Sequence, residues 1–416
     1  MKYLRDYLNR FSYDNSGLRQ VGLELEYPVV SQGSFEQFSV IPSLELLSGM
    51  RGSVPIYDDY YEDQIVGYED EFGNTITPEF STSVLEIAFP PEASLIDFDS
   101  RNNVWLRNFR EFFASRGGLI LGYGGLPITS NATRTKKRRY EVLRDFLGPS
   151  VDVIGLTASS QVSIEVSQEE MVIALNVCNA FSGPSIALTA NSSVVGGENT
   201  GLLGYREAVW DIFSSERCGV PPAKFYDIEE YLEFLFNFPI VIEKGEEDYY
   251  IPGITFSERI SGDYNPDLFW KLYPLHEGTI WFNARLRAPY GTIEIRPNCT
   301  QPHGDYLAVA AFWLGIIEQL SEANELMKLI GWDAWRKFRI ECIKHGMDAR
   351  VDGIDAHNLV RYILGISERG LKNRGLGEEV FLDPLKARLH RRKNPAQDAL
   401  EVYNKKGIRA MSEFVA

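Results

Sequence analysis

The sequence of 416 residues is poor in several features that would assign a protein quickly to a class. Cysteine is rare: the four cysteines lie far apart, and no Cys-x-x-Cys pair occurs. The five histidines also lack the spacing of zinc ligands. These absences argue against a zinc centre and against a disulfide-stapled fold, and they predict reduced thiols in a cytoplasmic protein.

Long hydrophobic runs are missing as well. The longest nearly unbroken apolar run, Tyr306 to Ile317, has 12 residues, whereas a transmembrane helix needs about 20. The N-terminal segment MKYLRDYLNRF carries charges where a signal peptide would be apolar. We therefore expect no secretory signal and no membrane partner.

Three short motifs that mark common enzyme folds do not occur. There is no Gly-x-Ser-x-Gly elbow, which disfavours a serine hydrolase. There is no Gly-x-x-x-x-Gly-Lys loop, and no Gly-x-Gly-x-x-Gly turn opens a helix. P-loop and dinucleotide-binding folds are disfavoured for that reason.

Positive charge is in short supply. Lysine and arginine total 42 against 58 aspartates and glutamates, which gives a net charge of −16. A nucleic-acid partner requires an electropositive surface, so none is expected. The hydrophobic share of 44% and the charged share of 24% are those of a globular protein. An anionic small ligand would need local cations or metal ions.

The pattern of residues changes along the chain. Up to about Arg296, short strand-like runs alternate with loops that contain glycine and proline, whereas helix-like periodicity dominates from Asp305 onward. This predicts an α+β fold in which helices cover an antiparallel sheet. We expect a catalytic core with the sheet over 1–304 and a helical part over 305–416, packed together as effectively one domain.

Several strand-like runs place charged or amide side chains on one face. In VGLELEY, Glu24 and Glu26 point away from the apolar face of the strand. The same alternation recurs in SVLEIAF, SSQVSIEV, TIWFNARL and GTIEIRP, with the polar members Glu86, Gln161, Ser163, Glu165, Asn283, Arg285, Glu294 and Arg296. A sheet with one face in water would give this pattern. Five strands with clustered glutamates also suit a site where carboxylates converge on a hard divalent cation such as Mg²⁺.

Basic residues gather in loop-like segments. TRTKKRRY, residues 133–140, suits either a solvated loop or a segment near nucleotide phosphates. ANSSVVGGENTGLLGYREAVW is rich in Gly, Asn and Ser before a predicted helix, as in loops that approach a ligand closely. Arg206, near the start of that helix, and Arg217, just beyond it, are either surface residues or bidentate clamps for a substrate carboxylate.

Six segments, in order along the chain, resemble the glutamate–cysteine ligase family of plants and many bacteria, which belongs to the glutamine-synthetase-like carboxylate–amine ligases. VGLELEY resembles its opening Glu-x-Glu strand, and PEFSTSVLEIAFPP resembles its second metal-binding strand, without the common Glu-Pro-Gly-Gly-Gln lead-in. TASSQVSIEVS is similar to its Gln-Val-Asn strand, with Ser163 in the position of the asparagine. The other three are ANSSVVGGENTGLLGYREAVW with ERCGVPP, HEGTIWFNARLRAPYGTIEIRP and GLKNRGLGEEVFLDPL. The resemblance implies a curved antiparallel sheet that forms an active-site funnel covered by helices.

The resemblance also implies roles for individual residues. The ligands of two or three Mg²⁺ ions would be Glu24, Glu26, Glu86 and Glu294. The catalytic residues would be Arg296, as the partner of the transferring phosphate, and Arg285. Substrate would be bound by Arg206, which would grip the glutamate α-carboxylate, and by Gln161, Ser163, Tyr205 and Arg217. ATP would be bound by His276, Asn283 and Arg139.

The implied reaction joins the γ-carboxylate of glutamate to the α-amine of cysteine at the expense of ATP, through a γ-glutamyl phosphate. Two alternatives stay open: the same chemistry with another amine acceptor, and a non-catalytic relative that keeps the fold. The implied partners are small molecules, without nucleic acid or membrane, and the implied state is a monomer or a homodimer.

Overall fold

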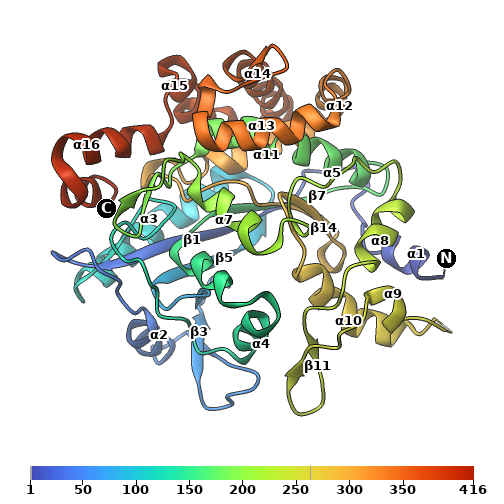
Figure 1. Cartoon of the computed structure of the whole chain (residues 1–416), viewed down its shortest axis with the longest axis horizontal. Coiled ribbons are helices and arrows are strands. Elements are labelled where there is room, and N and C mark those ends of the chain that lie inside the picture. Colours follow the sequence, from blue (N-terminus) through green and yellow to red (C-terminus); the bar gives the residue numbers. More distant parts are fainter. Residues whose placement is uncertain (1, 263) are drawn as a thin grey trace.

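The computed structural model describes residues 2–262 and 264–416 and is built around one antiparallel sheet (Figure 1). Over these residues the strand order is β14-β15-β7-β1-β5-β4-β3-β2, with β6 also paired to β1, and the sheet does not close on itself. Its strands are β1 Val21–Ser31, β2 Val54–Tyr57, β3 Ile65–Glu69, β4 Thr75–Pro78, β5 Val84–Glu92, β6 Gly118–Ile120, β7 Ser160–Glu165, β14 Ala284–Arg287 and β15 Thr292–Ile295. The predicted α+β class and antiparallel sheet are confirmed.

Strand β1 lies at the centre of the sheet and separates its two faces. Leu23 and Leu25 are buried in the main hydrophobic core, and Glu24 and Glu26 alternate with them on the opposite face. The register with β5 sets Glu26 opposite Glu86, so residues of the same kind share a face across neighbouring strands. The period-two alternation therefore decides which carboxylates meet.

Helices cover the apolar face of the sheet. Helix α11, Ala308–Glu318, is buried over nearly its whole length and packs against β1 and β7. It crosses α14, Ala356–Arg374, where a Cβ on Gly315 would lie 2.1 Å from the Ser367 carbonyl oxygen. Glycine at this crossing allows the two backbones to touch. Helices α3 Leu95–Ala114 and α5 Met171–Ala180 cover neighbouring strands on this side.

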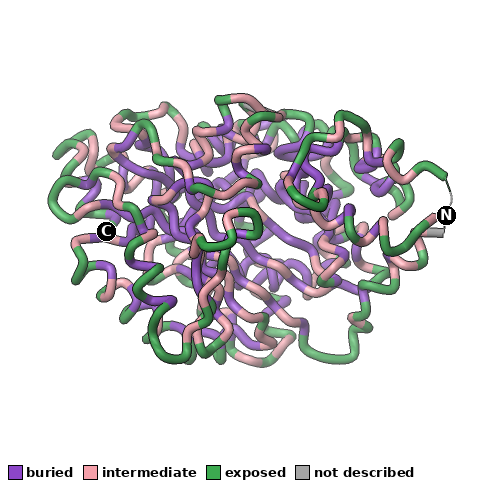
Figure 2. Tube along the Cα trace, turned by 90° about the horizontal axis from the view of Figure 1, so that it is seen from below, coloured by how far each residue is buried: buried purple, intermediate pink, exposed green. Residues whose placement is uncertain are grey.

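The polar face of the sheet is enclosed by other segments (Figure 1). They are α4 Arg138–Leu147, the 3₁₀ segment η1 Pro149–Leu156, α7 Tyr205–Ser214, α10 Pro266–Gly278 and β13 Trp281–Phe282, which pairs with β10 Cys218–Gly219. Buried residues fill the interior of the molecule, and exposed ones lie along the peripheral loops and helices (Figure 2).

The remaining elements lie around these layers. They are α1 Lys2–Leu8, α2 Ile41–Ser48, α6 Ser182–Thr189, α8 Ile228–Phe236, α9 Phe256–Arg259, α12 Leu320–Lys328, α13 Trp332–His345, α15 Asp383–Arg391, α16 Pro395–Phe414, β8 Val194–Val195, β9 Glu198–Asn199, β11 Glu243–Lys244, β12 Tyr249–Tyr250, β16 Arg350–Val351, β17 Ile354–Asp355, and the 3₁₀ turns η2 Ala288–Tyr290, η3 His303–Asp305, η4 Gly346–Asp348 and η5 Glu378–Leu382. In the described part of the chain no single helix has the length and apolarity to cross a membrane, although the bent pair α5 and α6 passes by length and composition together. All four cysteines are free and buried.

Candidate active site

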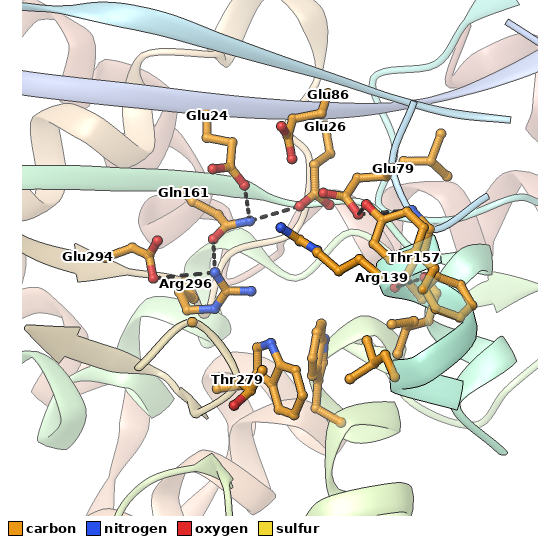
Figure 3. Close-up of a pocket in the computed structure, with 18 of the residues that line it drawn as sticks. Glu24, Glu26, Glu79, Glu86, Arg139, Thr157, Gln161, Thr279, Glu294 and Arg296 are labelled. Carbon is orange, nitrogen blue, oxygen red and sulfur yellow. Dashed lines mark hydrogen bonds and ion pairs between the residues drawn. The ribbon is translucent and has the colours of Figure 1, made fainter. Parts of the chain in front are cut away.

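A cavity of about 340 Å³ lies on the polar face of the sheet. Pockets for small molecules span roughly 300–1,000 Å³, so this volume suits a small ligand. Residues of strands β1, β5, β7, β14 and β15 line its floor, and residues of α4, η1, α7, α10 and β13 line its walls. Figure 3 shows part of this lining. The surfaces that meet here come from segments far apart in the sequence.

Four glutamates converge in this cavity, and we call them the carboxylate cluster. Glu24 and Glu26 belong to β1, Glu86 belongs to β5, and Glu79 directly follows β4. Each offers one carboxylate oxygen, and these four oxygens lie within 4.8 Å of one another. Mg²⁺ takes oxygen ligands at about 2.1 Å, so oxygens this close suit a cation held between them.

The electrostatics of the carboxylate cluster also favour a cation. Burial, and next the neighbouring charges of Glu26 and Glu294, raise the pKa of Glu24 to about 8. Burial, and next the charges of Glu24 and Glu79, raise the pKa of Glu86 well above its ordinary value. A divalent cation would offset both the burial and the mutual repulsion, so the chemistry of this donor set fits a bound Mg²⁺ ion.

Gln161 links the carboxylate cluster to a neighbouring arginine. It lies opposite Glu24 in the register of β1 and β7. Its Nε2 donates to Glu24 at 2.6 Å and to Glu26 at 2.8 Å. Its Oε1 accepts a hydrogen bond from Arg296 (Figure 3). One side-chain amide therefore orients two carboxylates and one guanidinium.

Glu294 is surrounded by arginines. It pairs with Arg285, with Arg287 at 2.8 Å and with Arg296 at 3.4 Å. Burial acts to raise the pKa of Glu294, but the three guanidiniums, Arg285 first, outweigh burial and hold the pKa well below its ordinary value. The structure thus places Glu294 beside the carboxylate cluster with its charge neutralised by arginine. Its role as a metal ligand stays a prediction.

Two arginines approach the ring of Trp210. The guanidinium carbons of Arg206, on α7, and Arg296, after β15, each lie 5.7 Å from the Trp210 ring centre. Arg206 Nη1 donates to the carbonyl oxygen of Arg296 at 2.6 Å and also pairs with the buried Glu207. This wall of the cavity is positively charged and suits a carboxylate or phosphate ligand.

The basic side chains at residues 134–139 point to different places in the structure. Arg139 lines the cavity and reaches toward the space between Glu26 and Arg296 (Figure 3). Arg138 donates two hydrogen bonds of 2.8 Å to Asp248, and Lys137 Nζ donates to the Pro78 carbonyl oxygen at 3.0 Å. Arg139 is thus the basic side chain of this segment that is placed to meet a ligand.

The cavity contains most of the residues predicted from the sequence. Those that line it are Glu24, Glu26, Glu86, Arg139, Gln161, Arg206, Arg285, Glu294 and Arg296. Ser163, Tyr205, Arg217, His276 and Asn283 are not part of the lining.

Three of these excluded residues are buried behind the cavity wall. His276 is 1% exposed, stacks on Phe256 and contacts the Leu235 carbonyl oxygen at 2.9 Å, and burial lowers its pKa to about 4. Asn283 donates to Glu207 at 3.0 Å, behind Arg206. Arg217 donates to the Thr279 and Pro239 carbonyl oxygens. These three side chains support the wall from behind, and their predicted roles in binding ATP or substrate stay predictions.

The other two belong to strand β7 and helix α7. Ser163 is opposite Glu294 in the register of β7 and β15, and Gly22 is opposite it on β1. Tyr205 is the first residue of α7 and packs against a smaller apolar cluster that includes Leu126 and Val194. Neither side chain lines the cavity.

Sequence reasoning missed Glu79, Arg287 and Trp210, all of which line the cavity. The signal for Glu79 was its position in PEFSTSVLE, because a short turn from β4 into β5 returns it to the neighbourhood of Glu86. The signal for Arg287 was its alternation with Arg285 in NARLR. Trp210 follows Arg206 by one helical turn.

The fold occurs in solved ligases. A glutamate–cysteine ligase from Francisella tularensis, solved in complex with AMP, matches with a TM-score of 0.56 at 12% identity, over 97% of this chain and 89% of that chain. A bifunctional glutathione synthetase from Pasteurella multocida matches with a TM-score of 0.57 at 13% identity, over 99% of this chain and 54% of that chain. At such low sequence identities the similarity shows only that the chain shares the fold of these two solved ligases.

The sequence gives the family. It matches Glutamate-cysteine ligase family 2 (GCS2) over residues 20–413, and the chain belongs to this family. The resemblance drawn from the six segments is thereby confirmed. The chain is 26% identical over 290 residues to the chloroplastic glutamate–cysteine ligase of Solanum lycopersicum and 27% identical over 296 residues to that of Nicotiana tabacum. These matches cover 65% and 66% of this chain but 54% and 55% of the relatives, so the chain spans about half the length of the curated relatives it matches.

Proposed function

We propose that the chain catalyses the ATP-dependent ligation of the glutamate γ-carboxylate to the α-amine of cysteine, giving γ-glutamylcysteine, ADP and phosphate. The observation that carries the proposal is one cavity that joins the carboxylate cluster to a group of arginines. Membership of Glutamate-cysteine ligase family 2 supports the same reaction. The ligase of the same fold that was solved with AMP supports an adenine nucleotide as co-substrate.

The chemistry explains why the site needs these residue types. A carboxylate is a poor acyl donor because its leaving group would be oxide. Attack of a γ-carboxylate oxygen on the γ-phosphorus of ATP forms a C–O–P linkage and breaks the bond to ADP. The amine nitrogen then attacks the carbonyl carbon, phosphate leaves with the bonding electron pair, and the amine loses a proton. Charge on the transferring phosphoryl group must be stabilised by cations in both steps.

The residues of the cavity divide this task. Glu24, Glu26, Glu79 and Glu86 would hold Mg²⁺, which supplies Lewis-acid stabilisation of phosphate charge when bound. Arg296 is oriented by Gln161 and would stabilise the transferring phosphoryl group. Arg206 would orient the glutamate α-carboxylate, and Arg139 would contact the nucleotide phosphates.

The test is ADP release by the purified protein with ATP, Mg²⁺ and glutamate across a panel of amines. We expect release that requires both glutamate and Mg²⁺ and that increases with cysteine. If another amine stimulates ADP release and cysteine does not, that amine would take the place of cysteine as the acceptor. No glutamate-dependent release with any amine would contradict the proposal.

A substitution in the same cavity sharpens the test. Glu294→Gln is expected to remove Mg²⁺-dependent turnover while the protein stays folded, because the change keeps the shape of the side chain and removes the charge that orients three arginines. Full activity of this variant would contradict the proposal that Glu294 orients the arginines of the active site. A cytoplasmic location and a monomeric or dimeric state are further proposals, which rest on the sequence alone.

A further inference from the structure

A buried carboxylate behind the cavity has no part in the reaction as described so far. Glu277, near the C-terminal end of α10, is fully buried and does not line the cavity. One of its oxygens accepts the Tyr273 hydroxyl at 3.1 Å. The other lies 3.3 Å from Nε of Arg287, which does line the cavity. Glu277 is therefore one contact away from the site.

Arg287 connects Glu277 to the site. Its Nη1 donates to Glu294 at 2.8 Å, and its Nε lies 3.3 Å from a Glu277 oxygen in an ion pair in which neither of these two atoms makes a hydrogen bond. Glu294 lies 3.4 Å from Nη1 of Arg296, the residue proposed to meet the transferring phosphoryl group. A guanidinium is planar and rigid, so anchoring its Nε side also sets the direction of its Nη side. Contacts run without interruption from Glu277 to Arg296.

The end of α10 also holds the second arginine of β14. Arg285 Nη1 donates to the carbonyl oxygens of Glu277 at 3.1 Å, Gly278 at 3.1 Å and Ile280 at 2.7 Å, and its Nε pairs with Glu294. Carbonyl groups at a helix C-terminus lack intrahelical partners and carry partial negative charge. Two arginines that orient Glu294 are thus fixed by one helix end, one through backbone oxygens and one through the Glu277 carboxylate.

Apolar packing does not account for an acidic residue at this place. Burying a carboxylate is unfavourable unless it is paired. The groups around Glu277 are Tyr7 of α1, Tyr231 of α8, Tyr273 of α10, Arg285 and Arg287 of β14, and the backbone N–H of Ala288. Burial raises the pKa of Glu277 to about 7, against the opposing effect of Arg287 and then Arg285. The group that holds Arg287 therefore changes its charge near neutral pH.

We propose that Glu277 is a positioning residue: its carboxylate pairs with Arg287, Arg287 orients Glu294, and Glu294 in turn orients Arg296 for phosphoryl transfer. This inference rests on the proposed function, because it concerns the geometry of the same site. Glu277 itself does not touch a substrate.

The variant Glu277→Gln tests the inference in the full-length protein. The change keeps the volume and removes the charge, so kcat is expected to fall on the order of tenfold, as for other residues that orient a site from behind, with little change in KM for ATP or glutamate. In the wild type, kcat is expected to rise with pH through about 7, and this limb should be absent from the variant. Wild-type kcat and pH dependence in Glu277→Gln would overturn the inference.

A matched control separates positioning from general damage. Asp267→Asn removes an exposed carboxylate from the same helix and is expected to leave kcat and its pH dependence unchanged. A purely structural role for Glu277 would lower the melting temperature and the specific activity together without changing the form of the pH dependence. That result would also overturn the inference.

An infrared titration makes the pairing testable without activity. The difference between wild type and Glu277→Gln should show a protonated carboxyl band that disappears with a midpoint near 7. The midpoint should rise in Arg287→Gln, because the variant lacks the cation that favours the ionised form. An unchanged midpoint would overturn the inference, whereas lack of turnover in the wild type would contradict the proposed function and leave this titration valid.

Discussion

Glu79 completes a set of oxygens that β1 and β5 supply only in part. Its Oε2 accepts the backbone N–H of Phe80 at 2.9 Å and lies 3.4 Å from the Tyr140 hydroxyl. Burial acts to raise the pKa of Glu79, but its hydrogen bond with Glu86 and next the charge of Lys137 outweigh burial and lower the pKa. Glu79 is therefore ionised at neutral pH and available to a cation.

Glu79→Gln is expected to raise the Mg²⁺ concentration required for half-maximal ADP release by at least about tenfold, because the amide keeps one oxygen but removes the negative charge. The measurement is ADP release as a function of Mg²⁺ concentration, supported by calorimetric titration of the ion. Glu69→Gln, an exposed glutamate on β3, is the control and should behave as wild type. An unchanged Mg²⁺ requirement in Glu79→Gln would remove this residue from the carboxylate cluster.

Individual site residues were predictable where strand alternation decides their direction. Glu24, Glu26 and Glu86 follow from a period of two, which fixes the face of each side chain. Glu79 lies in the turn after β4, where no period applies. Motif resemblance did not distinguish residues in the cavity from those behind it. His276 is an example, because its contact with Leu235 and its stacking on Phe256 turn its side chain into the core.

Helix α4 carries Arg139 and Tyr140 to the cavity and is held from outside. Arg138 pairs with Asp248 between β11 and β12, and Val142 of α4 packs with Val241, Ile242 and Tyr249. Lys244 extends the connection to Asp59, between β2 and β3, at 2.7 Å. Two ion pairs, half-buried for Arg138 with Asp248 and exposed for Lys244 with Asp59, thus join three segments around the wall that presents Arg139.

Arg138→Gln is expected to speed amide hydrogen exchange at residues 243–250, because the hairpin loses its charged contact with α4. Added salt should act in the same direction on the wild type, since exposed ion pairs are screened. Lys328→Gln, which breaks an ion pair with Glu325 on the remote helix α12, is the control. Unchanged exchange in Arg138→Gln would show that apolar contacts alone hold the hairpin.

At the level of elements, periodicity predicted strands followed by helices, but it did not predict which strands pair. Strand β7 lies between β1 and β15, more than a hundred residues from each. Such pairing depends on non-local contacts that a sequence window does not contain. The apolar run from Tyr306 to Ile317 coincides with α11, a helix whose faces are all covered.

Over the whole molecule, the buried carboxylates link stability to pH and metal. Burial is the main cause that raises the pKa of Glu24 from 4.5 to about 8, and it also raises the pKa values of Glu26 and Glu86. Between pH 5 and 8 these carboxyl groups therefore bind more protons in the metal-free native state than in the unfolded chain. These groups should lower the stability of the metal-free protein as pH rises through this window.

Thermal unfolding with a chelator and with Mg²⁺ checks this linkage. The melting temperature of the metal-free protein should fall from pH 6.5 to pH 8, above the range in which the buried His276 and His303 oppose the effect, and Mg²⁺ should restore it most at pH 8, because the ion binds the ionised cluster of the native state. A melting temperature that does not respond to Mg²⁺ at pH 8 would contradict cation binding by the carboxylate cluster.

The central claim is that ATP activates the side-chain carboxylate of glutamate by phosphorylation in this cavity. The direct measurement uses glutamate labelled with ¹⁸O in the γ-carboxylate, together with ATP, Mg²⁺ and the amine that supports ADP release. Attack of that carboxylate on the γ-phosphorus transfers one labelled oxygen to phosphate in each turnover, so labelled phosphate equal in amount to ADP is predicted. Phosphate without label would contradict the account, because ADP would then arise without phosphorylation of glutamate.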